Sequence, residues 1–133
     1  MMTASFARAP DLAEIEVIAN HAYGAIPAVL RARVDDVVIR VLDFPDPETE
    51  REMGLRNPFE LLGLYRGVPL GEKSLNDAPA DVDMIFLYRR PLLDYWCETG
   101  EDLTALIRHV LIHEIGHHFG FSDAEMEALE AAG

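Results

Sequence analysis

The sequence predicts a single α+β domain in which a few short strands pack against several helices. Three observations carry this prediction: a length of 133 residues, three short segments rich in β-branched and aromatic residues, and longer segments with apolar residues at helical spacing. A chain of this length can bury one hydrophobic core and is too short for two domains. The predicted domain therefore spans residues 1–133, and residues 1–10 are expected to form a loose N-terminal tail.

Two helices and one strand are predicted in the first third of the chain. Apolar residues recur at helical spacing after Asp11, a favourable N-cap, and predict a helix that ends near residues 21–22. Pro27 is expected to open a short second helix that ends near Arg33. Residues 37–42 are β-branched and nearly all apolar, which predicts a buried strand.

Two further strands are predicted in the middle of the chain. Residues 61–70 are predicted to form a second strand that runs into a turn at Arg66-Gly67, and Gly63 and Pro69 favour an edge position. Residues 71–81 are expected to form a polar loop. Residues 83–88 are apolar enough to lie in the centre of the sheet.

The last third of the chain is predicted to be helical. Pro91 is expected at the first position of a helix over residues 92–98. A long helix should begin near Thr99, with Asp102 supplying the charge of a capping box. Its apolar residues cover more than one face, so this helix is expected to be buried on several sides. Ser122 and Glu125 form a second capping signature before a short final helix.

The composition indicates which classes of partner and which cellular compartment are favoured. A net charge of −13 disfavours nucleic acid and anionic membranes, since Lys and Arg chiefly hold a phosphate backbone. We find no apolar run long enough to cross a bilayer and no export signal at the N-terminus. The single Cys97 has no internal disulfide partner and is expected to be a buried packing thiol. These features predict a cytoplasmic protein.

The stretch around which the chain is organised is residues 109–123, which contain four of the five histidines. It includes the motif H-E-x-x-H at His113, Glu114 and His117. On a helix the two histidines lie one turn apart on one face, so both imidazoles can bind one metal ion, and Glu114 can act as general base toward a metal-activated water. Gly120 can then end the helix and bring Asp123 toward the ion. The sequence therefore predicts a zinc site.

Other residues of this stretch are weaker candidates. His118 points about 100° away from His117 and is expected to support or pack rather than bind the metal. His109 lies one turn before His113, too far along a straight helix to be a favoured third ligand. Asp123 could instead serve only as the first residue of the next helix, where the helix dipole favours an acid. Glu127, one turn further, is the alternative third ligand.

Three segments together resemble the small bacterial zincin-like metallopeptidase family: L-L-G-L-Y-R-G-V-P-L at 61–70, D-M-I-F-L-Y-R-R-P-L-L at 83–93 and H-E-I-G-H-H-F-G-F-S-D at 113–123. The resemblance implies a minimal zincin-like fold, with a short mixed sheet of three to four strands packed against helices around a central H-E-x-x-H helix. It also implies a zinc ion and peptide-bond hydrolysis. The third segment is similar to the metzincin pattern with Asp123 in place of the last histidine, although Met126 lies too close for the Met-containing turn of that group.

The expected function is thus a zinc peptidase that acts on a peptide or protein substrate, which could pair with the predicted edge strand. Two alternatives remain. Bacterial ribosomal-RNA-maturation metalloenzymes place three histidines at the spacing of His113, His117 and Asp123. They do not require Glu114, they have a histidine where this chain has Asp123, and the net charge of −13 disfavours RNA. The other alternative is a zinc-binding module without turnover.

Overall fold

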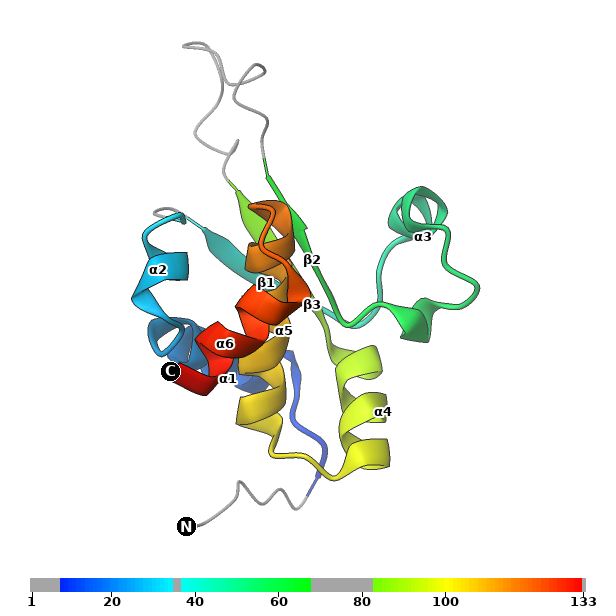
Figure 1. The fold of residues 1–133 in the computed structure, drawn as a ribbon. Helices are drawn as coiled ribbons and strands as arrows, with labels where there is room; N and C mark the ends of the chain where they lie inside the picture. Colours follow the sequence, from blue (N-terminus) through cyan, green and yellow to red (C-terminus); the bar gives the residue numbers. More distant parts are fainter. Residues whose placement is uncertain (1–7, 35–36, 68–82, 133) are drawn as a thin grey trace.

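The structure is a computed structural model that describes residues 8–34, 37–67 and 83–132. Within these ranges six α-helices and three strands form an α+β domain, which confirms the predicted fold class (Figure 1). The helices are α1 (Leu12–Gly24), α2 (Ala28–Arg31), α3 (Pro47–Met53), α4 (Arg89–Thr99), α5 (Leu103–His118) and α6 (Asp123–Ala132), with a short 3-10 helix η1 (Pro58–Glu60). The strands are β1 (Val38–Leu42), β2 (Gly63–Arg66) and β3 (Met84–Tyr88).

The sheet is mixed, with strand order β1-β3-β2. β1 runs parallel to β3, and β2 runs antiparallel to β3. The central position of residues 84–88 and the edge position of β2 are as predicted. Residues 68–70 of the predicted segment 61–70, and all of the predicted loop 71–81, lie outside the described residues.

One face of the sheet is packed against helices, and on the opposite face Tyr88 of β3 is also buried. α1 packs on β1 and α5 on β2, and the face packed against these helices carries the buried side chains Ile39, Val41, Ile85, Leu87 and Tyr65. The prediction that residues 37–42 form a buried strand is correct for Ile39 and Val41 and wrong for Val38 and Arg40, which point to the opposite face and are exposed. β1 is an edge strand with alternating burial, a pattern that its nearly continuous apolar sequence does not reveal.

β2 approaches α5 closely at Gly63. A Cβ atom at this position would lie 2.8 Å from Val110 Cγ1 and 3.0 Å from the carbonyl oxygen of Phe86. A side chain would push the strand away from the helix. Gly63, which favoured an edge strand in the sequence, therefore also sets the distance between the edge strand and α5.

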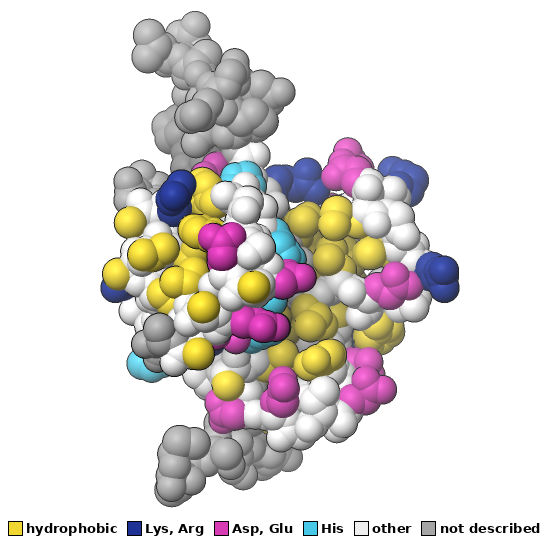
Figure 2. Space-filling model, in the orientation of Figure 1, with side chains coloured by type: hydrophobic (Ala, Val, Ile, Leu, Met, Phe, Trp, Pro, Cys, Tyr) yellow, Lys and Arg dark blue, Asp and Glu magenta, His cyan; other side chains and the backbone are white. Residues whose placement is uncertain are grey.

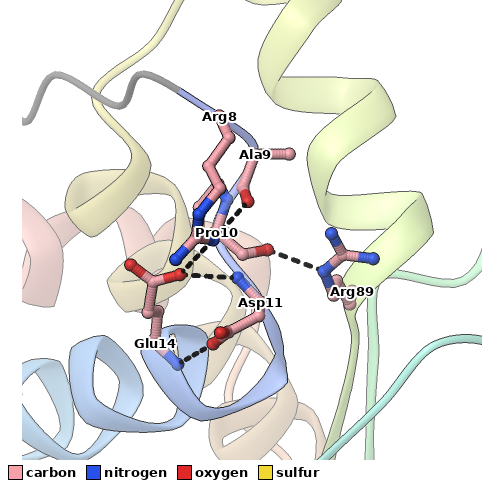
Figure 3. A network of polar contacts seen from close by, with 6 residues as sticks. All are labelled: Arg8, Ala9, Pro10, Asp11, Glu14 and Arg89. Carbon is pink, nitrogen blue, oxygen red and sulfur yellow. Dashed lines mark hydrogen bonds and ion pairs between the residues drawn. The ribbon is translucent and has the colours of Figure 1, made fainter.

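Polar contacts fix the start of α1 (Figure 3). The Glu14 backbone N–H donates to Asp11 Oδ1 at 2.8 Å, and the Asp11 N–H donates to Glu14 Oε1 at 3.0 Å, so Asp11 is the predicted N-cap within a full capping box. Arg8 donates to Glu14, and Arg89 of α4 donates to the Pro10 carbonyl oxygen at 2.7 Å. Of the segment expected to be a loose tail, residues 8–10 thus contact two helices, and residues 1–7 lie outside the description.

The boundary between α4 and α5 differs from the prediction. Thr99 is the last residue of α4 and its hydroxyl donates to the Tyr95 carbonyl oxygen, while Asp102 caps α5 by accepting from the Ala105 N–H at 3.0 Å. Gly100 between them has φ 68°, a left-handed conformation that ends a helix. Thr99 cannot cap α5 because a helix terminator follows it. α4 also begins at Arg89, two residues before Pro91.

Two smaller expectations need correction. α2 ends at Arg31, and Pro27 is its N-cap rather than its first residue. Cys97 is exposed on α4, so it is not a buried packing thiol. Among the described residues, no helix is both long and apolar enough to span a bilayer.

α5 is the central helix of the domain (Figure 1). It contacts α1, α2, α4, α6 and β2, and eight of its sixteen residues are buried, from Leu103 to Gly116. This confirms the prediction that the helix carrying H-E-x-x-H is buried on several sides, between the sheet and the C-terminal segment. The motif is therefore held on a helix that neighbouring elements fix on several sides.

Candidate metal centre

Three histidines lie along one stripe of α5. His109, His113 and His117 follow one another at intervals of one turn, and their ring centroids are 4.1 Å apart for the first pair and 5.8 Å for the second. His113 is half-buried, and His117 is exposed. Figure 2 shows histidine side chains in the middle of this face of the molecule, with acidic side chains next to them and hydrophobic side chains lining the depression on their other side.

A tight turn after α5 brings the chain back along the same helix. Gly120 has φ 81°, as predicted for the residue that ends the helix, and the Phe121 N–H donates to the Gly116 carbonyl oxygen at 2.8 Å. The guanidinium of Arg33 lies 5.9 Å from the ring centroid of Phe119 and 5.8 Å from that of Phe121. These contacts link both flanks of the turn to the exposed segment that follows α2.

α6 then begins with the predicted capping box. The Glu125 N–H donates to Ser122 Oγ at 3.1 Å, and the Ser122 N–H donates to Glu125 Oε1 at 2.9 Å. The buried Met126 packs directly against Gly116, where an added Cβ would lie 2.8 Å from Met126 Cγ. The missing side chain at Gly116 therefore lets α6 cross close to α5 and fixes where the acids of α6 lie.

This turn brings Asp123 to the histidines. Asp123 Oδ1 lies 3.3 Å from His117 Nε2, and one possible ligand atom from each of His113, His117 and Asp123 lies within 4.8 Å of the other two. Asp123 and His117 are both exposed, so the open side of this triad faces solvent. The three residues proposed from the sequence as metal ligands are thus close together.

The donor set fits a zinc ion. Two imidazoles and one carboxylate are a ligand set that binds zinc with one position left open. His113 Nε2 is buried and has no hydrogen-bond partner among the described residues, an arrangement that costs free energy unless another group binds the atom. Burial, followed by the nearby His109, lowers the pKa of His113, which favours the neutral imidazole that a metal requires.

Glu114 points from the same helix to the edge strand. Its Oε1 accepts a hydrogen bond from the Tyr65 backbone N–H at 3.3 Å. Burial raises the pKa of Glu114 above its usual range, and the Tyr65 hydrogen bond and the charge of His117 oppose part of that increase. Glu114 is therefore a carboxylate beside the histidines whose basicity is increased by its surroundings.

The register of the sheet explains why the Tyr65 N–H is available. The Tyr88 N–H donates to the carbonyl oxygen of Leu62, the residue just before β2. Leu62, Leu64 and Arg66 are therefore in hydrogen-bonded pairs with β3. Gly63 and Tyr65 alternate with them and direct their backbone N–H and C=O groups to the open edge. Glu114 binds at this open edge.

His118, predicted to pack or support rather than to bind the ion, stacks on the Tyr65 ring with centroids 4.0 Å apart. It also contacts Gly67, where an added Cβ would lie 2.6 Å from His118 Cε1. The Tyr65 hydroxyl donates to Asp83 Oδ2 at 2.9 Å. His118 thus joins α5 to the edge strand on the side away from the metal ligands.

Glu127, the alternative third ligand, is exposed on α6 and belongs to neither of the two groups of potential metal ligands among the described residues. The second group contains a residue that the sequence analysis missed: Glu130, together with His109 and His113. The sequence signal that could have indicated Glu130 is its spacing from Asp123. Glu130 lies seven residues after Asp123, close to two helical turns, and therefore on the same face of α6.

Comparison with known protein families places most of the chain in one family. The model of a family described as zincin-like metallopeptidase matches residues 34–132. The match covers all three strands and the whole histidine-rich stretch. No curated protein was found to match the chain.

Proposed function

Because the chain belongs to the zincin-like metallopeptidase family, we propose that it is a zinc-dependent peptidase with Glu114 as its general base. The observation that carries this proposal is the grouping of His113 and His117 of α5 with Asp123 of α6, next to the half-buried Glu114 of α5. His113, His117 and Asp123 would hold the ion. Zinc there would act as a Lewis acid toward the scissile carbonyl and the attacking water.

Glu114 would carry the proton through the reaction. Its carboxylate accepts the proton of the attacking water and then passes it to the leaving amine. A general base works best when its pKa lies near the working pH, and burial moves the pKa of Glu114 upward in that direction. The hydrogen bond from the Tyr65 N–H and the charge of His117 act in the opposite direction and offset part of this increase in pKa.

The substrate class we propose is a peptide or protein in extended conformation. The outward N–H and C=O groups of Gly63 and Tyr65 at the edge of β2 can pair with such a strand next to Glu114. The depression lined by hydrophobic side chains beside the histidines in Figure 2 would accommodate side chains of the bound peptide.

RNA is the less favoured substrate. The ligand spacing alone would also suit a metal-dependent endoribonuclease, but a channel for RNA is normally built from Lys and Arg. The chain has 11 Lys and Arg residues against 24 Asp and Glu residues. The proposed site itself adds carboxylates from Asp123 and Glu114, which repel a phosphate backbone.

The test compares wild type with Glu114→Gln and His113→Ala. Zinc content is measured by mass spectrometry of metals, and hydrolysis is followed on a diverse peptide mixture and, separately, on structured RNA. We expect wild type to cleave peptides, Glu114→Gln to keep zinc but lose cleavage, and His113→Ala to lose both. Glu127→Gln, on the exposed side of α6, is the matched control for loss of one carboxylate.

The outcomes separate the alternatives. Full peptide turnover by Glu114→Gln would refute the general-base role. Cleavage of RNA without cleavage of peptides would favour the endoribonuclease. Stoichiometric zinc with no turnover of either substrate would favour a zinc-binding module.

A further inference from the structure

α5 and α6 form an antiparallel pair with potential metal ligands at both ends of their contact. Asp123 at the start of α6 lies beside His117, and Glu130 near its other end lies beside His109. Between them, Met126 packs on Gly116. The three histidines of α5 therefore have a carboxylate of α6 at each end of their row.

The contacts of Glu130 are specific to two imidazoles. Its Oε1 lies 2.8 Å from His109 Nδ1 and 3.2 Å from His113 Nε2, and its Oε2 lies 3.1 Å from His109 Nδ1. Both Glu130 Oε1 and His113 Nε2 are buried atoms without a well-aligned hydrogen bond among the described residues. Two buried ligand atoms thus lie near one another with no partner of good geometry, a costly arrangement unless a further group binds between them.

We propose that His109, His113 and Glu130 form a second binding site for a divalent ion such as Zn²⁺, overlapping the H-E-x-x-H site through His113. One possible ligand atom from each of these residues lies within 4.8 Å of the others, as in the first triad. Two imidazoles and a carboxylate are again a zinc-type ligand set. Because His113 belongs to both triads, the chain holds one ion in either triad rather than one ion in each.

A simpler explanation is that Glu130 and His109 form only an ion pair that holds α6 on α5. Such a pair, with His109 half-exposed at 50% and Glu130 at 25%, contributes about 0–1 kcal/mol. An ion pair explains the distance from Glu130 to His109. The same oxygen also lies 3.2 Å from His113 Nε2 without hydrogen-bond geometry, so Glu130 faces two imidazoles rather than His109 alone, as a ligand of a shared ion would.

Metal binding can be measured without any enzyme assay. Zn²⁺ is titrated by calorimetry and Co²⁺ by its visible absorption, with circular dichroism to verify the fold of each variant. His117→Ala/Asp123→Ala removes the first triad and leaves the second. His109→Ala/Glu130→Gln removes the second and leaves the first. Glu127→Gln, which alters an exposed carboxylate of the same helix, is the control.

We expect wild type to bind one ion, and folded His117→Ala/Asp123→Ala to bind one ion still, more weakly. Adding Glu130→Gln to that variant should raise its Kd at least about tenfold, equal to about 1.4 kcal/mol, whereas adding Glu127→Gln should leave it unchanged.

The second site is overturned if the folded His117→Ala/Asp123→Ala variant binds no ion, or if its binding does not respond to Glu130→Gln. Simultaneous binding of two ions by wild type would overturn the exclusive occupancy. The result for His109→Ala/Glu130→Gln concerns the proposed peptidase site alone, since loss of binding there would refute the first triad and leave the second standing.

Discussion

Gly116, the second unspecified residue of H-E-x-x-H, controls how closely α6 packs on α5. A Cβ atom at this position would collide with Met126 Sδ and lie 2.8 Å from Met126 Cγ, while Phe121 Cβ would be at an ordinary 3.6 Å. Met126 is fully buried and cannot move outward into solvent. The substitution Gly116→Ala should therefore displace α6, which carries Asp123, without changing any proposed ligand.

Two effects of opposite sign determine how much Gly116→Ala changes the free energy of unfolding. Replacing a glycine by alanine inside a helix stabilises the fold by about 1 kcal/mol. Adding a methyl group to a filled site costs about 1–3 kcal/mol, and the flexibility of a methionine keeps the cost away from the upper limit. We expect Gly116→Ala to lower the free energy of unfolding by about 1 kcal/mol and to weaken zinc binding several-fold.

Urea denaturation of the zinc-free protein gives a sharp test when it is carried out in two backgrounds. Met126→Ala removes the obstructing side chain at a cost of about 2–5 kcal/mol, which a domain with 5–15 kcal/mol of stability can tolerate. In that background Gly116→Ala should become stabilising by about 1 kcal/mol, because only the helix propensity remains. Gly24→Ala is the control, since a Cβ there meets nothing within 4 Å.

An equal stabilisation by Gly116→Ala in both backgrounds would refute the packing argument. So would unchanged zinc affinity together with a clear loss of stability, because the displaced helix is the one that carries Asp123.

Three further predictions concern single side chains. Asp102→Ala should cost about 1 kcal/mol of stability in thermal or urea unfolding because it removes the N-cap of α5, and Thr99→Ala should cost clearly less; equal losses would contradict the assigned cap. In a competitive zinc titration Asp123→Ala should weaken binding at least about tenfold and Glu127→Ala should change it little, with the reverse order moving the third ligand to Glu127. Because burial raises the pKa of Glu114, its ionised form destabilises the fold as the pH rises through that pKa. Zinc-free Glu114→Gln should therefore be more stable than wild type at pH 7, with the gain lost below about pH 4.5; a gain that is independent of pH would exclude this cause.

The elements that the sequence predicted well are those with strong local signals. The left-handed Gly120 follows from the need to end a helix of fixed periodicity, and Ser122 with Glu125 forms a capping box because both partners lie within one turn. The order of the strands also followed from local features, since glycine weakens the edge strand and the apolar residues 84–88 lie in the centre.

The errors arise where tertiary structure decides between local alternatives. Thr99 and Asp102 are both acceptable caps, and only the left-handed Gly100 between them shows that Thr99 belongs to the preceding helix. Residues 37–42 are apolar except for Arg40, yet Val38 and Arg40 are both exposed on one face of the sheet. Glu130 reaches the histidines only through the antiparallel packing of α6 on α5, so its seven-residue spacing from Asp123 becomes informative only when that packing is known.

The hydrogen bond from Tyr65 to Glu114 links the strength of the base to the presence of a substrate. The Tyr65 N–H points to the open edge of β2, where the carbonyl oxygen of a pairing peptide would compete for it. This bond lowers the pKa of Glu114, so its transfer to an incoming peptide would leave the carboxylate more basic. In the proposed peptidase, Glu114 would thus be less basic when no peptide is bound. Binding of the peptide would itself increase the basicity of the carboxylate that activates the water.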